Sequence, residues 1–449
     1  MKFTKMSLVA ALLVGSSAFA IENVKVSGDV KAYYSTDDAT TGGIANVVGG
    51  GAKSDSLFNA GSSAAQFALG LGVTADLAKG ISAGAHATVL TTLGVEGQLV
   101  NNVWEGTNGT SDSWMIDEAW VAATMGKTTA KIGRMELDTP LTHTEKWSVA
   151  KNTFESVVLL NQDIPDTTLV AAYVGGSNSN SAVNNGFGHG TAAPAAGIAN
   201  LVQTEGGTNN TTFSQYYNGA FAVAAINNSF KPLTVQAWYY DAPQFLDAYW
   251  LQADLGMEGI MAGVQYTQTN YNKSNVFPIA KDADNDAVAV MLGYNGMKDI
   301  ATIKVAYSTT GTETDSTLGL GAGANIATYN GTANSHSKLY TEAWWNYAYI
   351  TRADTDAWNV TIESPVNGMF DLGVYYTHTT TGDNNAVVPA ADIDMDEFTV
   401  TASKTVGPLD ATLAYIYTAA DDQNIAVGAP AGTTGDNFST IQVYLTLNF

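Results

Sequence analysis

The C-terminal segment of the chain alternates between apolar and polar side chains from Thr440 onward. It runs from Phe438 to Phe449 as F-S-T-I-Q-V-Y-L-T-L-N-F. One parity is apolar and contains Ile441, Val443, Leu445, Leu447 and Phe449. The other parity is polar and contains Thr440, Gln442, Tyr444, Thr446 and Asn448. Because side chains alternate across a strand with a period of two, this segment is predicted to be a β-strand with one apolar and one polar face.

The same unit recurs along the chain as two alternating strands joined by a very short turn and followed by a longer polar loop. Tight turns are predicted at residues 78–80, 126–127, 164–166, 227–231, 256–258, 296–298, 365–368 and 406–408. Long loops are predicted at residues 36–63, 94–113, 136–151, 175–212, 270–285, 310–356, 379–392 and 419–437. The connections at one end of the sheet are therefore short and those at the other end are long. Outer-membrane barrels have the same arrangement, with short periplasmic turns and long external loops.

Counting these strands predicts an all-β fold, a transmembrane antiparallel barrel of about 18 strands over residues 21–449. Residues 338–350 also alternate, but counting them as a strand gives an odd number, which a closed barrel with both termini in the periplasm excludes. We therefore assign residues 310–356 and 175–212 to long external loops, with a short helix or strand extension at 341–349. A bulged or missed partner strand would give two more strands.

The first twenty residues predict a secretory signal peptide. Lys2 and Lys5 precede a short apolar core, and Ala18-Phe19-Ala20 has the spacing of small residues at a cleavage site. The apolar run is too short for a membrane anchor. We expect cleavage near Ala20 and a mature protein in the outer membrane of a Gram-negative bacterium.

Composition excludes several classes of protein. The formal net charge is −23, and it falls to about −25 when the two signal-peptide lysines are removed. Nucleic acid is excluded as a partner because binding it needs a basic surface. The chain has no cysteine. Its histidines share no metal-ligand spacing, and no nucleophile elbow or phosphate-binding loop is present, so we expect neither an enzyme nor a bound cofactor.

Two acidic clusters are the only candidates for metal binding. They consist of Asp282, Asp284 and Asp286, and of Asp392, Asp394 and Asp396. Aspartates at alternate positions begin a calcium-loop pattern, but the glycine and final glutamate of that loop are missing. A solvated acidic rim explains both clusters better, with loosely bound Ca²⁺ bridging to lipopolysaccharide as an intermediate reading.

The segment from Gly133 to Leu141, G-R-M-E-L-D-T-P-L, is followed by N-T-F-E from Asn152 to Glu155. These motifs resemble those of the OprD-type (Opr family) outer-membrane porins, close to the major porins of the epsilonproteobacteria. The resemblance is strongest over residues 64–175 and the last strands. It implies an 18-stranded diffusion channel, often a homotrimer, whose third loop folds inward. It also implies that the terminal Phe449 is a signal to the barrel-assembly machinery.

The resemblance assigns residues 136–151 to the inward-folded constriction loop. The expected constriction residues are Arg134, Glu136, Asp138, His143, Glu145 and Lys146. Strict alternation gives Arg134 outward parity, so its place in the pore requires a bulge or a break at Gly133. The expected lumen-lining charges are Lys25, Asp29, Lys31, Asp76, Lys131 and Lys304. The arginine ladder of carboxylate-specific channels is missing, which favours a broader pore.

We therefore predict an outer-membrane porin, a passive water-filled channel for ions and small hydrophilic solutes with weak cation selectivity. Its partners would be outer-membrane lipid, lipopolysaccharide and these solutes. One alternative is a surface adhesin or antigen with a plugged barrel. The other is an outer-membrane hydrolase, which would need a catalytic Ser, His or acid at the barrel rim.

Overall fold

The computed structural model describes residues 21–40, 56–95, 97–103, 113–147, 149–178, 202–203, 214–243, 245–273, 282–297, 300–312, 321–326, 336–382, 392–425 and 433–449. The predicted signal peptide lies outside these residues, as do most of loop 175–212 and parts of loop 310–356. In the part of the chain that the structure describes, no helix has the length and apolar character needed to cross a bilayer.

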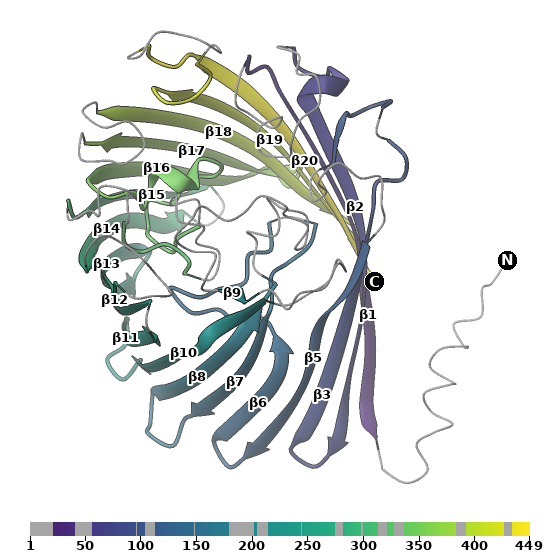
Figure 1. The fold of residues 1–449 in the computed structure, drawn as a ribbon, viewed down its shortest axis with the longest axis vertical. Coiled ribbons are helices and arrows are strands. Elements are labelled where there is room, and N and C mark those ends of the chain that lie inside the picture. Colours follow the sequence, from purple (N-terminus) through teal and green to yellow (C-terminus); the bar gives the residue numbers. More distant parts are fainter. Residues whose placement is uncertain are drawn as a thin grey trace, which may run out of the picture.

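The chain forms a closed antiparallel barrel of 18 strands (Figure 1). The first half of the ring consists of β1 (Glu22–Asp37), β2 (Ser63–Ala78), β3 (Ile81–Thr91), β5 (Ser113–Met125), β6 (Thr128–Met135), β7 (Phe154–Asn161), β8 (Thr167–Ser177), β10 (Ser214–Asn227) and β11 (Leu233–Ala242). The second half consists of β12 (Leu246–Met257), β13 (Ile260–Tyr271), β14 (Ala283–Met297), β15 (Ala301–Thr310), β16 (Thr355–Val366), β17 (Phe370–Thr381), β18 (Ile393–Val406), β19 (Leu409–Ala420) and β20 (Asn437–Asn448). The predicted fold class and strand number are confirmed.

Four short elements accompany the barrel strands. They are the two-residue strands β4 (Asn102–Val103) and β9 (Val202–Gln203) and the 3₁₀ turns η1 (Ala60–Ser62) and η3 (Tyr347–Tyr349). β4 pairs with the upper end of β2, and β9 pairs with β10. Both strands are too short to cross a bilayer, so they add nothing to the count of spanning strands.

The two faces of each strand differ as the alternation predicts. On β13, Val264 has 47% of its surface exposed, whereas the next residue, Gln265, has 1%. Val264 has the parity of the apolar outer surface, and Gln265 that of the polar interior. An exposed apolar band outside and polar side chains inside are the pattern of a barrel in lipid.

The short turns contain residues suited to tight hairpins. Between β16 and β17, Asn367 has a φ of 47° and Gly368 a φ of 68°. Positive φ at two successive positions gives the turn a twist that matches the flanking strands, and Asn-Gly is the preferred pair for it. The predicted turn at 365–368 therefore lies at a two-strand hairpin.

The barrel closes where β1 pairs with β20. The backbone N–H of Gly28 donates to the carbonyl of Phe449 at 2.8 Å, and the N–H of Phe449 donates to the carbonyl of Gly28 at 2.9 Å. A Cβ atom on Gly28 would lie only 2.4 Å from Cζ of Phe449, so the glycine leaves room for the terminal ring.

Candidate functional site in the lumen

The described residues between β6 and β7, 136–147 and 149–153, pack against lumen-facing side chains on two distant parts of the barrel wall; we call them the first lumen loop. Leu141 is fully buried in a cluster that includes Trp238 and Tyr240 of β11. Ala150 is buried in another cluster with Tyr33 of β1. Because β1 and β11 lie about half a ring apart in the strand order, this loop spans the interior.

The segment between β15 and β16 also enters the interior, and we call its described residues, 321–326 and 336–354, the second lumen loop. Gln265 of β13 donates to the carbonyl of Lys338 at 2.8 Å and accepts from the N–H of Tyr340 at 3.1 Å. Glu397 of β18, 1% exposed, accepts from the N–H groups of Trp344 at 2.8 Å and Asn346 at 2.6 Å. The sequence predicted a long external loop over 310–356, and it gave no sign of this inward part.

The two lumen loops are joined to each other. Ile326 donates its N–H to the carbonyl of Leu141 at 2.8 Å. The amide of Asn325 donates to Oε1 of Glu145 at 3.0 Å. Lys338 forms an ion pair with Asp138. We call this set of contacts the loop clasp, and it makes one continuous structure of the two segments.

The start and the end of the first lumen loop meet in a group of opposite charges. Lys151 lies 2.6 Å from Oε1 of Glu136 and also contacts the carboxylate of Glu118 on β5. Lys146 pairs with the other oxygen of Glu136. Burial opposes the change, but the hydrogen bonds from Lys146 and Lys151 hold the pKa of Glu136 below its ordinary value. Both signs of charge therefore stay present at neutral pH.

The expected constriction residues fall into three groups. Glu136, Asp138 and Lys146 take part in ion pairs of the first lumen loop. His143 and Glu145 are each 6% exposed and lie at the loop clasp. Arg134 precedes the loop and is described separately because it lies on a barrel strand.

Arg134 keeps the outward parity that strict alternation gives it. Ile132, two residues earlier, is 58% exposed, whereas Met135 is 1% exposed. Gly133 has a φ of 124°, yet the pairing of β6 with both neighbours continues through it without a shift. Nε of Arg134 donates to Glu155 at 2.9 Å on the same outer face. The break at Gly133 that would have turned Arg134 into the pore is not present.

The expected lumen-lining residues all have the inward parity of their strands: Lys25, Asp29, Lys31, Asp76, Lys131 and Lys304. Several have partners there. Lys31 lies 3.7 Å from Asp29, Lys304 lies 3.9 Å from Glu363, and Nζ of Lys131 lies 4.1 Å from the centre of the Trp120 ring.

The two acidic clusters lie at the long-loop ends of β14 and β18. Asp284 and Asp286 share outward parity with Val288, and Asp394 and Asp396 share it with Phe398. Asp396 accepts hydrogen bonds from Tyr376 at 2.5 Å and His378 at 2.9 Å. Among the described residues, no group of three or more acidic, histidine or cysteine side chains has a geometry that could hold a metal ion.

Sequence reasoning missed a β-bulge on β5. His86 of β3 pairs with Glu118 and Ala87 pairs with Ile116, so Asp117 is an extra residue on its strand. Ile116 and Ala119 are exposed on the outer face, and both acids between them face inward. A signal was available, because strict alternation would have turned one of two adjacent acids toward lipid.

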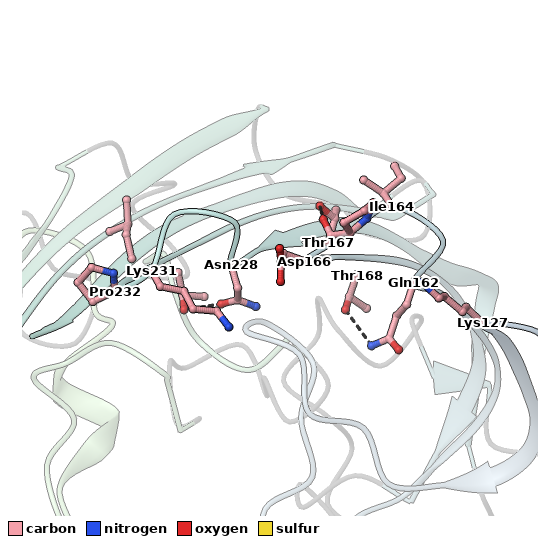
Figure 2. A pocket seen from close by; sticks show the side chains of 12 residues that line it. Lys127, Gln162, Ile164, Asp166, Thr167, Thr168, Asn228, Lys231 and Pro232 are labelled. Carbon is pink, nitrogen blue, oxygen red and sulfur yellow. Dashed lines mark hydrogen bonds between the residues drawn. The ribbon is translucent and has the colours of Figure 1, made fainter.

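A cavity of about 720 Å³ opens at the short-turn end of the barrel (Figure 2). It lies between the turns after β5, β7 and β10, and its lining includes Lys127, Asp166 and Lys231. Gln162 donates to Thr168 at 3.2 Å on its wall. The cavity is lined by both polar and apolar side chains, and it lies opposite the end from which the lumen loops enter.

Several solved structures share this architecture. Pseudomonas aeruginosa OccK8 (OprE) matches with a TM-score of 0.64 at 13% identity, covering 96% of this chain and 99% of that one. Pseudomonas aeruginosa OpdK with vanillate matches with a TM-score of 0.65 at 13% identity, covering 95% and 99%. A BenF-like porin from Pseudomonas fluorescens Pf-5 matches with a TM-score of 0.64 at 11% identity, covering 95% and 99%.

No protein-family model matches the sequence, and no curated protein matches it. At such low identity the structural matches establish the fold alone. The chain has the barrel fold of these outer-membrane proteins along nearly its whole length.

Proposed function

We propose that this protein is an outer-membrane porin, a passive water-filled channel for ions and small hydrophilic solutes. The observation that carries the proposal is the closed ring of 18 strands with a polar inner face. A barrel of this size is wide enough to leave an aqueous passage. The two lumen loops would narrow that passage without any group that couples transport to energy.

Purified protein added to a planar lipid bilayer should give stepwise conductance that is linear in voltage. A bilayer that stays silent with folded protein would contradict the proposal. It would favour an adhesin or antigen with a plugged barrel, whose external loops should then be needed for attachment to cells. An outer-membrane hydrolase would instead lose activity when a rim Ser, His or acid is replaced, and we propose no enzymatic activity.

We propose weak selectivity for cations. The excess of acidic residues supports it, because charges at the mouth of a low-dielectric pore raise the local concentration of ions of opposite sign. The narrow region itself is nearly balanced, since Glu136 is paired with both Lys146 and Lys151. Reversal potentials in a salt gradient test the sign directly, and a preference for anions would refute it.

We propose export through the predicted signal peptide, cleaved near Ala20, and insertion into the outer membrane through the barrel-assembly machinery. The contacts of Phe449 support the second step, because this residue bonds Gly28 at the seam between β1 and β20. Deleting Phe449 should reduce the folded barrel in outer-membrane fractions. Refolding of the same variant in detergent separates an assembly signal from a loss of intrinsic stability.

We propose a homotrimer in which the outer face of β5 and β6 contacts a neighbouring copy. The outward ion pair of Arg134 and Glu155 supports this, because an arginine facing lipid at mid-depth costs about 2–4 kcal/mol. Ala119 lies opposite Arg134 in the pairing of β5 with β6, and its small side chain is exposed on the same face. Arg134→Ala should convert the trimer into monomers on unheated gels; an unchanged trimer would exclude this face.

We propose that the acidic clusters at 282–286 and 392–396 form a solvated rim without a closed metal site, and that Ca²⁺ bridges this rim loosely to lipopolysaccharide. Their outward parity near the long-loop end supports contact with the outer leaflet. If so, chelation should lower the melting temperature in lipopolysaccharide-containing vesicles more than in detergent. An equal effect in both would argue against a lipid bridge.

A further inference from the structure

The bulge on β5 brings two acids into the lumen side by side. Asp117 has no opposite residue in the pairing of β3 with β5, and its side chain is fully buried. Its carboxylate lies 2.7 Å from Nδ1 of His86 and accepts from Oγ1 of Thr88 at 3.1 Å. Bulges frequently serve to re-aim a side chain in this way. The extra residue therefore creates an anchor on the wall that a regular strand could not offer.

The wall around this anchor is shaped to hold it. Nε2 of His86 lies 3.7 Å from Asp29 of β1. On β2, between these two strands, a Cβ atom on Gly70 would lie 2.5 Å from Oδ1 of Asp29 and 2.9 Å from Nε2 of His86. The glycine thus leaves space for a row of polar groups that crosses three strands. His86 is fixed at both of its ring nitrogens by this row.

Lys151 joins the anchor to both ends of the first lumen loop. Its side chain is 14% exposed, and its Nζ lies 4.0 Å from Asp117 and in contact with Glu118. The same Nζ bonds Glu136 at 2.6 Å, at the other end of the loop. Next to Lys151, Thr153 donates to the backbone carbonyl of Asp117 at 2.6 Å. The loop is therefore closed at its base by one cation among three carboxylates.

We propose that Asp117 and His86 are positioning residues that hold Lys151 in place, so that Lys151 keeps the base of the first lumen loop closed and the pore at one width. We call the contacts of Lys151 with Asp117, Glu118 and Glu136 the lock. Removing one partner of a buried charged group leaves the other uncompensated, so the lock should fail when any member is neutralised. The link to pore width rests on the proposed function, whereas the lock itself does not.

A cysteine reporter at the base of the loop tests the lock in the folded protein. Ala150 is 4% exposed and precedes Lys151, and the chain has no other cysteine to react. The rate at which Ala150→Cys reacts with a maleimide in detergent measures how often the base opens. We expect Asp117→Asn and Lys151→Met to raise this rate at least about tenfold, which corresponds to ~1.4 kcal/mol in the opening equilibrium.

Two further variants separate the lock from a general loss of stability. Lys151→Arg keeps the charge and should restore most of the protection. Lys304→Met removes another lumen lysine, paired with Glu363 on the other side of the barrel, and should leave the rate unchanged. Each variant is first shown to be folded by its mobility on unheated gels. Equal rates for Lys151→Met and the control, or for Lys151→Arg and Lys151→Met, would overturn the proposal.

A variant that removes only one hydrogen bond keeps the test decisive if Asp117→Asn does not fold. Thr153→Val deletes the bond to the carbonyl of Asp117. It should also raise the maleimide rate, and no rise would overturn the proposal. Because this readout needs no ion conduction, a silent bilayer would refute the proposed channel and leave the lock standing. In bilayers that do conduct, Asp117→Asn should show additional conductance levels.

Discussion

Asn325 and His143 bind each other through two hydrogen bonds although they are 182 residues apart in the sequence. The amide of Asn325 donates to the carbonyl of His143 at 2.9 Å, and its oxygen accepts from the N–H of His143 at 3.3 Å. The side-chain amide of Asn325 thus bonds the backbone of His143 in the way that a residue on a neighbouring β-strand would. These bonds join the first lumen loop to the second. The position of each loop therefore depends on the other.

Replacing Asn325 with alanine should loosen the loop clasp. Three hydrogen bonds are lost, to both backbone groups of His143 and to Glu145. At about 1 kcal/mol each, the contact should weaken by about 2–3 kcal/mol. We expect a larger and noisier single-channel conductance. Asn359→Ala is the control, because Asn359 is a buried lumen asparagine bonded to Thr377 on the wall. Equal effects of the two substitutions would mean that the clasp does not set the pore width.

Among the acids of the first lumen loop, Glu136 should affect ion selectivity most. Glu136→Gln leaves Lys146 and Lys151 with one negative partner fewer. A unit charge about 10 Å from an ion in water changes its energy by ~0.4 kcal/mol, so relative permeability should move about twofold toward anions. Glu145→Gln is the matched control, since Glu145 is buried at the clasp. The prediction fails if reversal potentials do not distinguish the two variants.

The loop clasp should weaken in acid because of His143. Burial lowers the pKa of His143 to about 4, against an ordinary value of 6.5; the acids Asp138 and Glu145 act in the opposite direction, and Lys338 and His336 act with it. A depressed histidine pKa means that stability is present above pH 6.5 and is lost as the pH falls toward 4. The loss amounts to about 3 kcal/mol.

His336 opposes part of this change. Burial lowers the pKa of His336, but the contact with Glu342 raises it by more, so the net shift of this pKa is upward. Its contribution is therefore present at low pH and is lost on the alkaline side.

Channel conductance recorded between about pH 7 and pH 4 should rise on acidification. His143→Phe, which keeps a ring but takes up no proton, should flatten the curve; an unchanged curve would exclude His143 as its source.

The cation preference should depend strongly on salt concentration. Acids at the long-loop end of the barrel include Asp38 and Asp421, whereas the base of the first lumen loop is balanced. The screening length falls from about 10 Å at 0.1 M to about 3 Å at 1 M. We expect the preference to be clear at the lower concentration and nearly absent at the higher one. A preference independent of salt would place its origin at the narrowest point instead.

The barrel was largely predictable because its strands obey a local rule. Alternation and turn residues located the strands, and the even-number requirement removed residues 338–350 from the count, as the structure bears out. The lock at Lys151 and the loop clasp were not predictable in this way. They depend on contacts between distant segments, such as Asn325 with His143, and on one extra residue in β5.

For Arg134, the sequence motif and the alternation of the strand predicted different orientations. The motif around it suggested a role in the pore, while simple alternation pointed outward, and the unbroken register of β6 agrees with alternation. A local periodic rule was thus more reliable here than a motif. The adjacent acids Asp117 and Glu118 could have indicated the bulge, because neither is suited to face lipid.

The seam between Gly28 and Phe449 makes β1 and β20 neighbours like any other pair of strands. In the closed barrel none of the described wall strands is an edge strand. The same fold can therefore form from a chain that begins at a different strand. A gene permuted to start within the β16–β17 turn, with the present ends joined by a short linker, should encode the same barrel in detergent. In cells that protein would present its strands to the assembly machinery in a different order, so its fate there would reveal how far assembly depends on that order rather than on the fold.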